Sequence, residues 1–277
     1  MTKIVFDTSY RVQPGDTVKS IAEKGFKDGD RWREVRLENG THFTSLDSSQ
    51  LLAGQRVYLP IKIGERVHPP SAYGQGDDFL STDDLMPLSP IYSNFYQGLI
   101  RFSPASLLLK RPIVQPLIEH FLEGKGGVYQ HDINAPLSRL LEDSPPFKSA
   151  FNSVVRQIQQ QISSFVSLND FDVNKLKISI PHFGFKPGKA DLTLFAAIGG
   201  IQGAELLLKR FTFNPDYSYS FEVFFVIYDD FGLGKDDRYS PSLYAAWNLQ
   251  HRGEAKPFVN EIILQKTITG TLSVSEK

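Results

Sequence analysis

The sequence of 277 residues contains no cysteine. This absence excludes a disulfide framework, a zinc site with cysteine ligands and a cysteine nucleophile. The chain also has no run of ~20 apolar residues, so no segment is expected to cross a membrane as a helix. The start, MTKIVFDTSY, lacks the apolar stretch of a secretory signal. We therefore expect a protein that is made in the cytoplasm and exported by a machine that needs no cleaved signal.

The chain also lacks an excess of charge of either sign. The chain has 30 Lys and Arg against 31 Asp and Glu, a net charge of -1, which argues against nucleic acid or anionic lipid as a partner. The motifs H-E-x-x-H, G-x-S-x-G and G-x-x-x-x-G-K-[ST] are missing, so zincin, serine-hydrolase and P-loop chemistry have no support. What the chain has in quantity is aromatic side chains, with 21 Phe and 11 Tyr, which predict substantial aromatic cores.

The N-terminal stretch YRVQPGDTVKSIAEK, residues 10–24, predicts a strand followed by a helix. Pro14-Gly15 ends the strand, because proline removes a ladder donor and glycine accepts a positive φ. Asp16 or Thr17 then caps the helix by accepting hydrogen bonds from its first amides. The apolar positions of this helix follow the i, i+3, i+4 spacing of a buried face: Val18, Ile21 and Ala22.

A second helix and a closing strand complete this N-terminal unit. Trp32 lies in a short helical pattern that Asn39-Gly40 is expected to end. The segment LLAGQRVYLP, residues 51–60, predicts a turn at Gly54 and then a strand that Pro60 stops. The predicted order is strand, helix, helix, strand.

These motifs resemble a LysM module over roughly residues 8–61, a small βααβ unit that binds N-acetylglucosamine-containing glycans such as peptidoglycan and chitin. The sequence departs from the family at Asn39-Gly40, where Asn-Pro is usual, and has a longer insertion that ends at Gln50 and borders the glycan groove. A module that keeps the fold without binding glycan is the alternative. The resemblance implies a ligand-binding groove formed by Gly15, Asp16, Thr17, Val18, Leu51 and Leu52.

The remainder of the chain predicts a second, larger domain. Helical patterns come first, and period-two segments rich in β-branched and aromatic residues follow, which is typical of an α+β domain with a mostly antiparallel sheet. The predicted boundaries are a LysM-like glycan-binding module over 1–61, a linker packed on the second domain over 62–101, and an α+β effector or toxin domain over 102–277.

An acidic segment after an apolar strand is the predicted catalytic site. Functional polar groups are often displayed at the ends of strands, which belong to a rigid scaffold. Carboxylates here could hold a divalent cation or act as acid and base, and a histidine could transfer protons near neutral pH. In the alternative interpretation the same residues cap turns and a helix end. The predicted catalytic residues are Asp229, Asp230, Asp236, Asp237 and His251.

A second polar cluster contains Tyr129, His131, Asp132 and Glu142. The glycines from Gly124 onward could let a ligand approach, or they could simply link two helices. A solvated loop is the interpretation that we favour for this cluster.

The larger domain, roughly residues 100–272, is similar to an uncharacterised domain family of Gram-negative bacteria. The segments YDDFGLGKDD and WNLQHRGEAKPFVNEI carry this similarity. The resemblance implies a toxin or effector of contact-dependent secretion, particularly type VI. A colicin M-like lipid II phosphodiesterase uses Asp-x-Tyr-Asp with a later Arg, but this chain has Val226 where the first Asp would stand.

Together these features predict a peptidoglycan-binding antibacterial effector that acts in the periplasm of a target cell as a hydrolase of the wall or of a wall precursor. A cognate immunity protein and a component of the secretion machine are the expected partners. A divalent cation is the cofactor that the carboxylates would accept. Two alternatives remain: a non-enzymatic wall-binding adaptor, and a toxin that disrupts the membrane.

Overall fold

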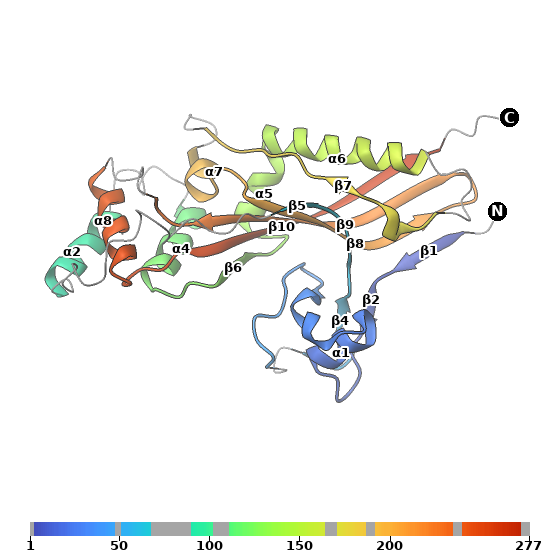
Figure 1. Cartoon of the computed structure of the whole chain (residues 1–277), viewed down its shortest axis with the longest axis horizontal. Coiled ribbons are helices and arrows are strands. Elements are labelled where there is room, and N and C mark those ends of the chain that lie inside the picture. The colour runs from blue at the N-terminus through green and yellow to red at the C-terminus, as the bar shows by residue number, and fades with distance from the viewer. Residues whose placement is uncertain are drawn as a thin grey trace.

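The computed structural model describes residues 3–47, 51–67, 90–101, 111–163, 171–186, 192–234 and 240–272. The fold is α+β with a large, mostly antiparallel sheet, as the sequence predicts. Figure 1 shows a small N-terminal unit below one long sheet and several helices above it. No helix within the described ranges is both long and apolar enough to cross a membrane.

The N-terminal module, residues 8–47 and 51–60, has its own small antiparallel sheet in the order β2-β4-β3. The second helix is a 3-10 helix that ends at Glu34, earlier than predicted, because Val35 is extended and the chain continues as a strand. In chain order the elements of the module are β2 (Ser9–Arg11), α1 (Val18–Phe26), η1 (Gly29–Glu34), β3 (Arg36–Leu37) and β4 (Arg56–Tyr58).

Local sequence explains how α1 begins and what it buries. Thr17 is the N-cap: its hydroxyl accepts a hydrogen bond from Ser20 N at 3.0 Å, and Thr17 N donates to Ser20 Oγ at 2.9 Å. This reciprocal capping box satisfies two amides that the helix itself leaves unpaired. The helix packs into a core that is separate from that of the large sheet and consists of Val12, Val18, Ile21, Ala22, Trp32, Val35, Phe43 and Val57.

The large sheet has the strand order β6-β10-β9-β8-β5-β7, and β1 pairs with the remaining part of β8. The pairs β10–β6 and β5–β7 are parallel, and the other pairs are antiparallel. Its strands are β1 (Ile4–Asp7), β5 (Ile61–Arg66), β6 (Val128–His131), β7 (Ile178–Ser179), β8 (Gly203–Phe213), β9 (Ser218–Phe231) and β10 (Phe258–Thr271).

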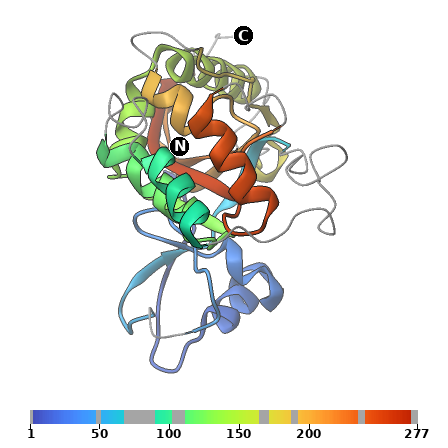
Figure 2. The ribbon, with the colours of Figure 1, turned by 90° about the vertical axis from the view of Figure 1, so that its left-hand side faces the viewer.

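Helices cover one face of this sheet, and the N-terminal module lies against the other (Figures 1 and 2). On α6 (Pro145–Ser163) the apolar residues of the predicted stripe, among them Val154, Ile158 and Ile162, are buried in the main core. Two helices, α2 (Pro90–Arg101) and α8 (Pro241–His251), contact each other at one end of the molecule. The remaining helices are α4 (Arg111–Leu122), α5 (Pro136–Asp143), η5 (Val173–Lys175) and α7 (Leu192–Ala197).

The segment predicted as a linker, 62–101, contains regular secondary structure at both of its described ends. Ile61–Arg66 form β5, which lies between β8 and β7, and Pro90–Arg101 form α2. A Cβ at Gly64 would lie 2.8 Å from the carbonyl oxygen of Ile178, so glycine allows β5 and β7 to approach closely. Because β1 and β5 both pair with β8, the chain enters and leaves the N-terminal module through strands of the same sheet.

Candidate functional site

The two loops that the sequence predicts to bind glycan lie side by side. Residues 13–17 follow β2, and residues 51–55 precede β4. Val12 N donates to Gln55 O at 2.9 Å, and Gly54 N donates to Val12 O at 2.8 Å. At the other end of β2, Thr8 N donates to Lys209 O of the large sheet at 3.0 Å. The predicted binding loops therefore lie at the end of the module remote from the sheet.

Within the first loop, Asp16 maintains the conformation. Its carboxylate accepts hydrogen bonds from Tyr10 Oη and Gln13 N, both at 2.8 Å, and pairs with Lys24 Nζ at 2.5 Å. Burial alone would raise the pKa of Asp16, but these contacts, led by Lys24, lower it overall. Gly15 has φ +85°, and a Cβ placed there would meet no atom within 4 Å, so the space beside its backbone is open.

The six predicted ligand-binding residues divide into structural and exposed positions. Val18 is fully buried in the module core, and Leu51 packs against that core. Leu52 in contrast is 67% exposed, although it is a large aliphatic residue. Gly15, Thr17 and Leu52 are the exposed members of the set, and Asp16 and Leu51 are half-buried.

The predicted catalytic carboxylates Asp229 and Asp230 end β9 and are 5% and 6% exposed. Successive side chains of a strand point to opposite faces, so these two do not share a face. Asp229 lies opposite Asn260 of β10 in the register, and Asn260 Nδ2 donates to Ala197 O of α7 at 2.9 Å. Burial raises the pKa of Asp229 well above its ordinary value, and the charge of Asp230 raises it further. Asp236 and Asp237 lie outside the described residues.

His251, the predicted proton-transfer group, is the last residue of α8 and packs on its own helix. Its ring stacks on Trp247 at a centroid distance of 4.2 Å, and Nδ1 lies 2.9 Å from Trp247 O. The adjacent Gln250 contacts both Leu233 N and Leu233 O at 2.9 Å, which holds α8 against the segment after β9. In the described part of the chain, no group of His, Asp and Glu residues has the geometry to hold a metal ion.

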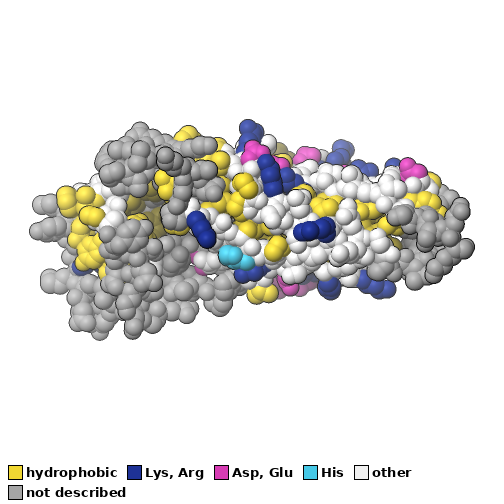
Figure 3. Space-filling model, turned by 90° about the horizontal axis from the view of Figure 1, so that it is seen from above, with side chains coloured by type: hydrophobic (Ala, Val, Ile, Leu, Met, Phe, Trp, Pro, Cys, Tyr) yellow, Lys and Arg dark blue, Asp and Glu magenta, His cyan; other side chains and the backbone are white. Residues whose placement is uncertain are grey.

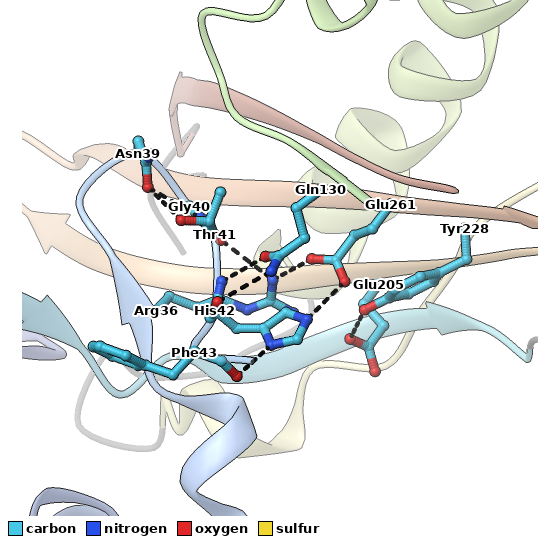
Figure 4. A network of polar contacts seen from close by, with 10 residues as sticks. All are labelled: Arg36, Asn39, Gly40, Thr41, His42, Phe43, Gln130, Glu205, Tyr228 and Glu261. Atoms are coloured by element: carbon cyan, nitrogen blue, oxygen red, sulfur yellow. Dashed lines mark hydrogen bonds and ion pairs between the residues drawn. The ribbon is translucent and has the colours of Figure 1, made fainter. Parts of the chain in front are cut away.

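A buried ionic contact joins the module to the sheet (Figure 4). Arg36 Nη1 from β3 lies 2.5 Å from Glu261 Oε1 of β10, and His42 Nε2 lies 3.2 Å from Glu261 Oε2. Burial would raise the pKa of Glu261, but the charge of Arg36 and the contact with His42 lower it overall. Burial would likewise lower the pKa of Arg36, but the charge of Glu261 raises it overall. Both oxygens of Glu261 are thus engaged, and the pair holds the two parts together.

Two further contacts extend this arrangement. Gln130 of β6 bonds the backbone of His42 in both directions: Oε1 accepts from His42 N at 2.7 Å, and Nε2 donates to His42 O at 3.1 Å. Tyr228 Oη donates to Glu205 Oε2 at 2.9 Å (Figure 4). Arg36, His42, Gln130 and Glu261 are called the interface network below. Its members come from three distant segments of the chain and no motif joins them, so the sequence does not predict it.

On the helix-covered side of the molecule, Lys and Arg side chains are more prominent than Asp and Glu but form no continuous patch (Figure 3). In the space-filling view from that side, Lys and Arg side chains are scattered among neutral groups and small apolar patches over the described surface (Figure 3).

Comparison with known proteins gives no family assignment. No family model matches the chain, and no curated protein matches it. A solved structure described as "Structure of PaeM, a colicin M-like bacteriocin produced by Pseudomonas aeruginosa" shares 14% identity and a TM-score of 0.25, covering 56% of this chain and 49% of that chain. The chain thus spans about half the length of that protein, and a TM-score this low establishes neither a shared fold nor a shared activity.

Proposed function

We propose that the chain is a peptidoglycan-binding antibacterial effector whose N-terminal module binds N-acetylglucosamine-containing glycans while the larger part acts on the cell envelope. The observation that carries the proposal is the placement of loops 13–17 and 51–55 side by side at the free end of the module. The opposite end is buried against the large sheet. A glycan strand therefore has access to these loops. A cognate immunity protein and a component of a secretion machine are the partners that such an effector requires.

The chemistry of the two loops suits a sugar. Gly15 allows close approach of a ring to the backbone, and Leu52 offers an apolar surface to the C–H face of a ring. Asp16 holds the first loop in place through Tyr10 and Lys24, so little ordering would be needed on binding. Attachment to the wall would raise the effective concentration of the larger part at its target.

Sedimentation of the full chain with purified peptidoglycan tests the module. We expect Leu52→Asp to sediment more weakly than wild type, because a charge would replace the apolar contact. Val67→Asp is the matched control, since Val67 is a 76% exposed aliphatic residue outside the module. Both changes are at exposed positions and should alter the free energy of unfolding by less than about 0.5 kcal/mol. Sedimentation of Leu52→Asp at the wild-type level would refute binding through this loop.

Expression directed to the periplasm of a bacterial host tests the envelope activity. We expect lysis or rounding by wild type, and loss of this effect in Asp229→Ala and His251→Ala variants whose melting curves stay cooperative. Rapid depolarisation would instead favour membrane disruption, and no effect would favour a binding adaptor. A chelator should silence a cation-dependent phosphodiesterase but not a two-carboxylate glycosidase. Wild-type toxicity in both folded variants would remove these residues from the active site.

A further inference from the structure

A pocket of about 370 Å³ lies away from both predicted sites, between α4, β6 and the loop that leads into α5. This volume is within the range of small-ligand sites. Ile113 and Pro116 of α4 line one wall, and Tyr129 and His131 of β6 line another. Three members of the cluster that was interpreted as a solvated loop, Tyr129, His131 and Asp132, thus border a defined cavity, and the first two lie on a strand and not in a loop.

His131 is the unusual group of this pocket, because it is only 8% exposed. Asn260 on the adjacent strand is fully buried, and its side chain is close enough to raise the pKa of the imidazole. Even so, His131 Nε2 and Asn260 Oδ1 both lack a hydrogen bond of normal geometry within the described part of the chain. Burial lowers the pKa of His131 to about 4, although Asn260 and Asp132 act in the opposite direction. The imidazole is therefore neutral near pH 7, with one donor and one acceptor nitrogen.

The floor of the pocket is formed by the start of α5, which has no side-chain cap. Ala135 is its N-cap and makes no side-chain hydrogen bond, and Pro136 follows it. A helix N-terminus carries partial positive charge and unpaired amides. Beside it, Asp132 Oδ1 accepts a hydrogen bond from Asn134 N at 2.8 Å. The pocket thus offers positive and negative character at close range.

This mixture selects against a charged ligand, because Asp132 would repel an anion and the N-terminus of α5 would repel a cation. A sugar ring suits it better, since each hydroxyl both donates and accepts and the C–H face can lie against Tyr129 or the α4 wall. We propose that this pocket binds one ring of a neutral N-acetylated sugar, with His131 as part of the wall that the ring lies against. The proposal rests on the proposed glycan specificity and assigns the larger part of the chain its own contact with the glycan.

Titration of the full-length chain with N,N'-diacetylchitobiose tests the pocket, using the side-chain NMR signals of the histidines and calorimetry. The Leu52→Asp background reduces the contribution of the module. We expect the His131 signals to shift, with the exposed His182 as an internal reference. Asn134→Trp should fill the pocket entrance and weaken binding at least ~10-fold, which corresponds to about 1.4 kcal/mol. Asn152→Trp, an exposed position on α6, is the matched control and should bind as the background does.

The outcomes separate this inference from the proposed function. Sedimentation with peptidoglycan together with silent His131 signals would overturn the pocket and leave the module intact. A His131 response together with equal sedimentation of wild type and Leu52→Asp would support the pocket and refute the module. Equal affinity of Asn134→Trp and Asn152→Trp would also overturn the pocket, because both variants keep His131 and the fold.

Discussion

The two faces of the large sheet are buried in different ways. The helix-covered face carries Phe225, Ile227, Ile262 and Leu264, which pack into one extensive apolar core. The module-covered face has a small apolar cluster of Tyr58, Leu207, Phe224, Val226 and Ile263. Next to that cluster lie the interface network and the buried Lys209, whose ammonium group is 4.4 Å from the ring centroid of Tyr58.

The difference shows what each kind of contact can specify. Apolar burial is non-directional, so the helices stabilise the sheet without requiring one exact partner. A buried ion pair contributes little net stability but makes every other arrangement costly, because it would leave a charge unpaired. We infer that the interface network sets the orientation of the module, while the apolar cluster supplies most of the favourable free energy.

The largest effect is expected from breaking the interface network. Glu261→Ala leaves Arg36 buried without its partner and should lower the free energy of unfolding by about 3–5 kcal/mol in denaturant titrations. The matched control on the helix-covered face is Glu142→Ala, which removes the partner of Lys266, a pair whose side chains are 42% and 17% exposed. That change should cost no more than about 1 kcal/mol.

A double variant sharpens this result. Arg36→Met with Glu261→Leu removes both charges, so most of the lost stability should return. Equal costs for Glu261→Ala and Glu142→Ala would contradict the distinction between the two faces.

An effect of intermediate size is expected from His131 on the helix-covered face, which should make the free energy of unfolding depend on pH. The pKa of His131 is about 4 when folded, against an ordinary value of 6.5. As pH falls from 6.5, the unfolded chain binds a proton that the folded chain does not, so stability is lost until about pH 4. The loss should be about 3 kcal/mol.

Comparison with a variant isolates this contribution from the other titrating groups. His131→Leu should lose about 3 kcal/mol less than wild type between pH 6.5 and 4, whereas the exposed His182→Leu should follow wild type. Parallel curves for wild type and His131→Leu would show that the histidine does not titrate in this way.

The smallest effect is expected from alanine substitutions at two glycines with positive φ, Gly40 and Gly253. A Cβ at Gly40 would lie 2.5 Å from Ile263 Cγ2, whereas one at Gly253 would meet nothing within 4 Å. Gly253→Ala should cost about 1 kcal/mol from backbone strain alone. Gly40→Ala should cost about 2–3 kcal/mol, because it also separates the module from the sheet. Melting curves of both variants measure the difference, and equal costs would mean that the interface yields to a methyl group.

Local sequence determined much of this fold. The Thr17 cap, the apolar spacing of α1 and α6, and the long β-branched and aromatic strands are all set by residues near one another in the chain. Period and capping act over one or two turns, so such elements can be recognised without tertiary information. The α+β class followed from their order. The roles assigned to Gly15, Leu52, Asp229 and His251 stay predictions.

Tertiary structure alone decided how those elements meet. Nothing near Ile61 indicates that β5 pairs with β8, because a short apolar alternation suits many edges. The pairing of Arg36 with Glu261, and the position of His131 beside Asn260, depend on strand register between distant segments. A register is selected by the summed burial of whole faces and not by any local motif. The sequence therefore determines which elements form, and long-range packing determines which polar groups are buried together.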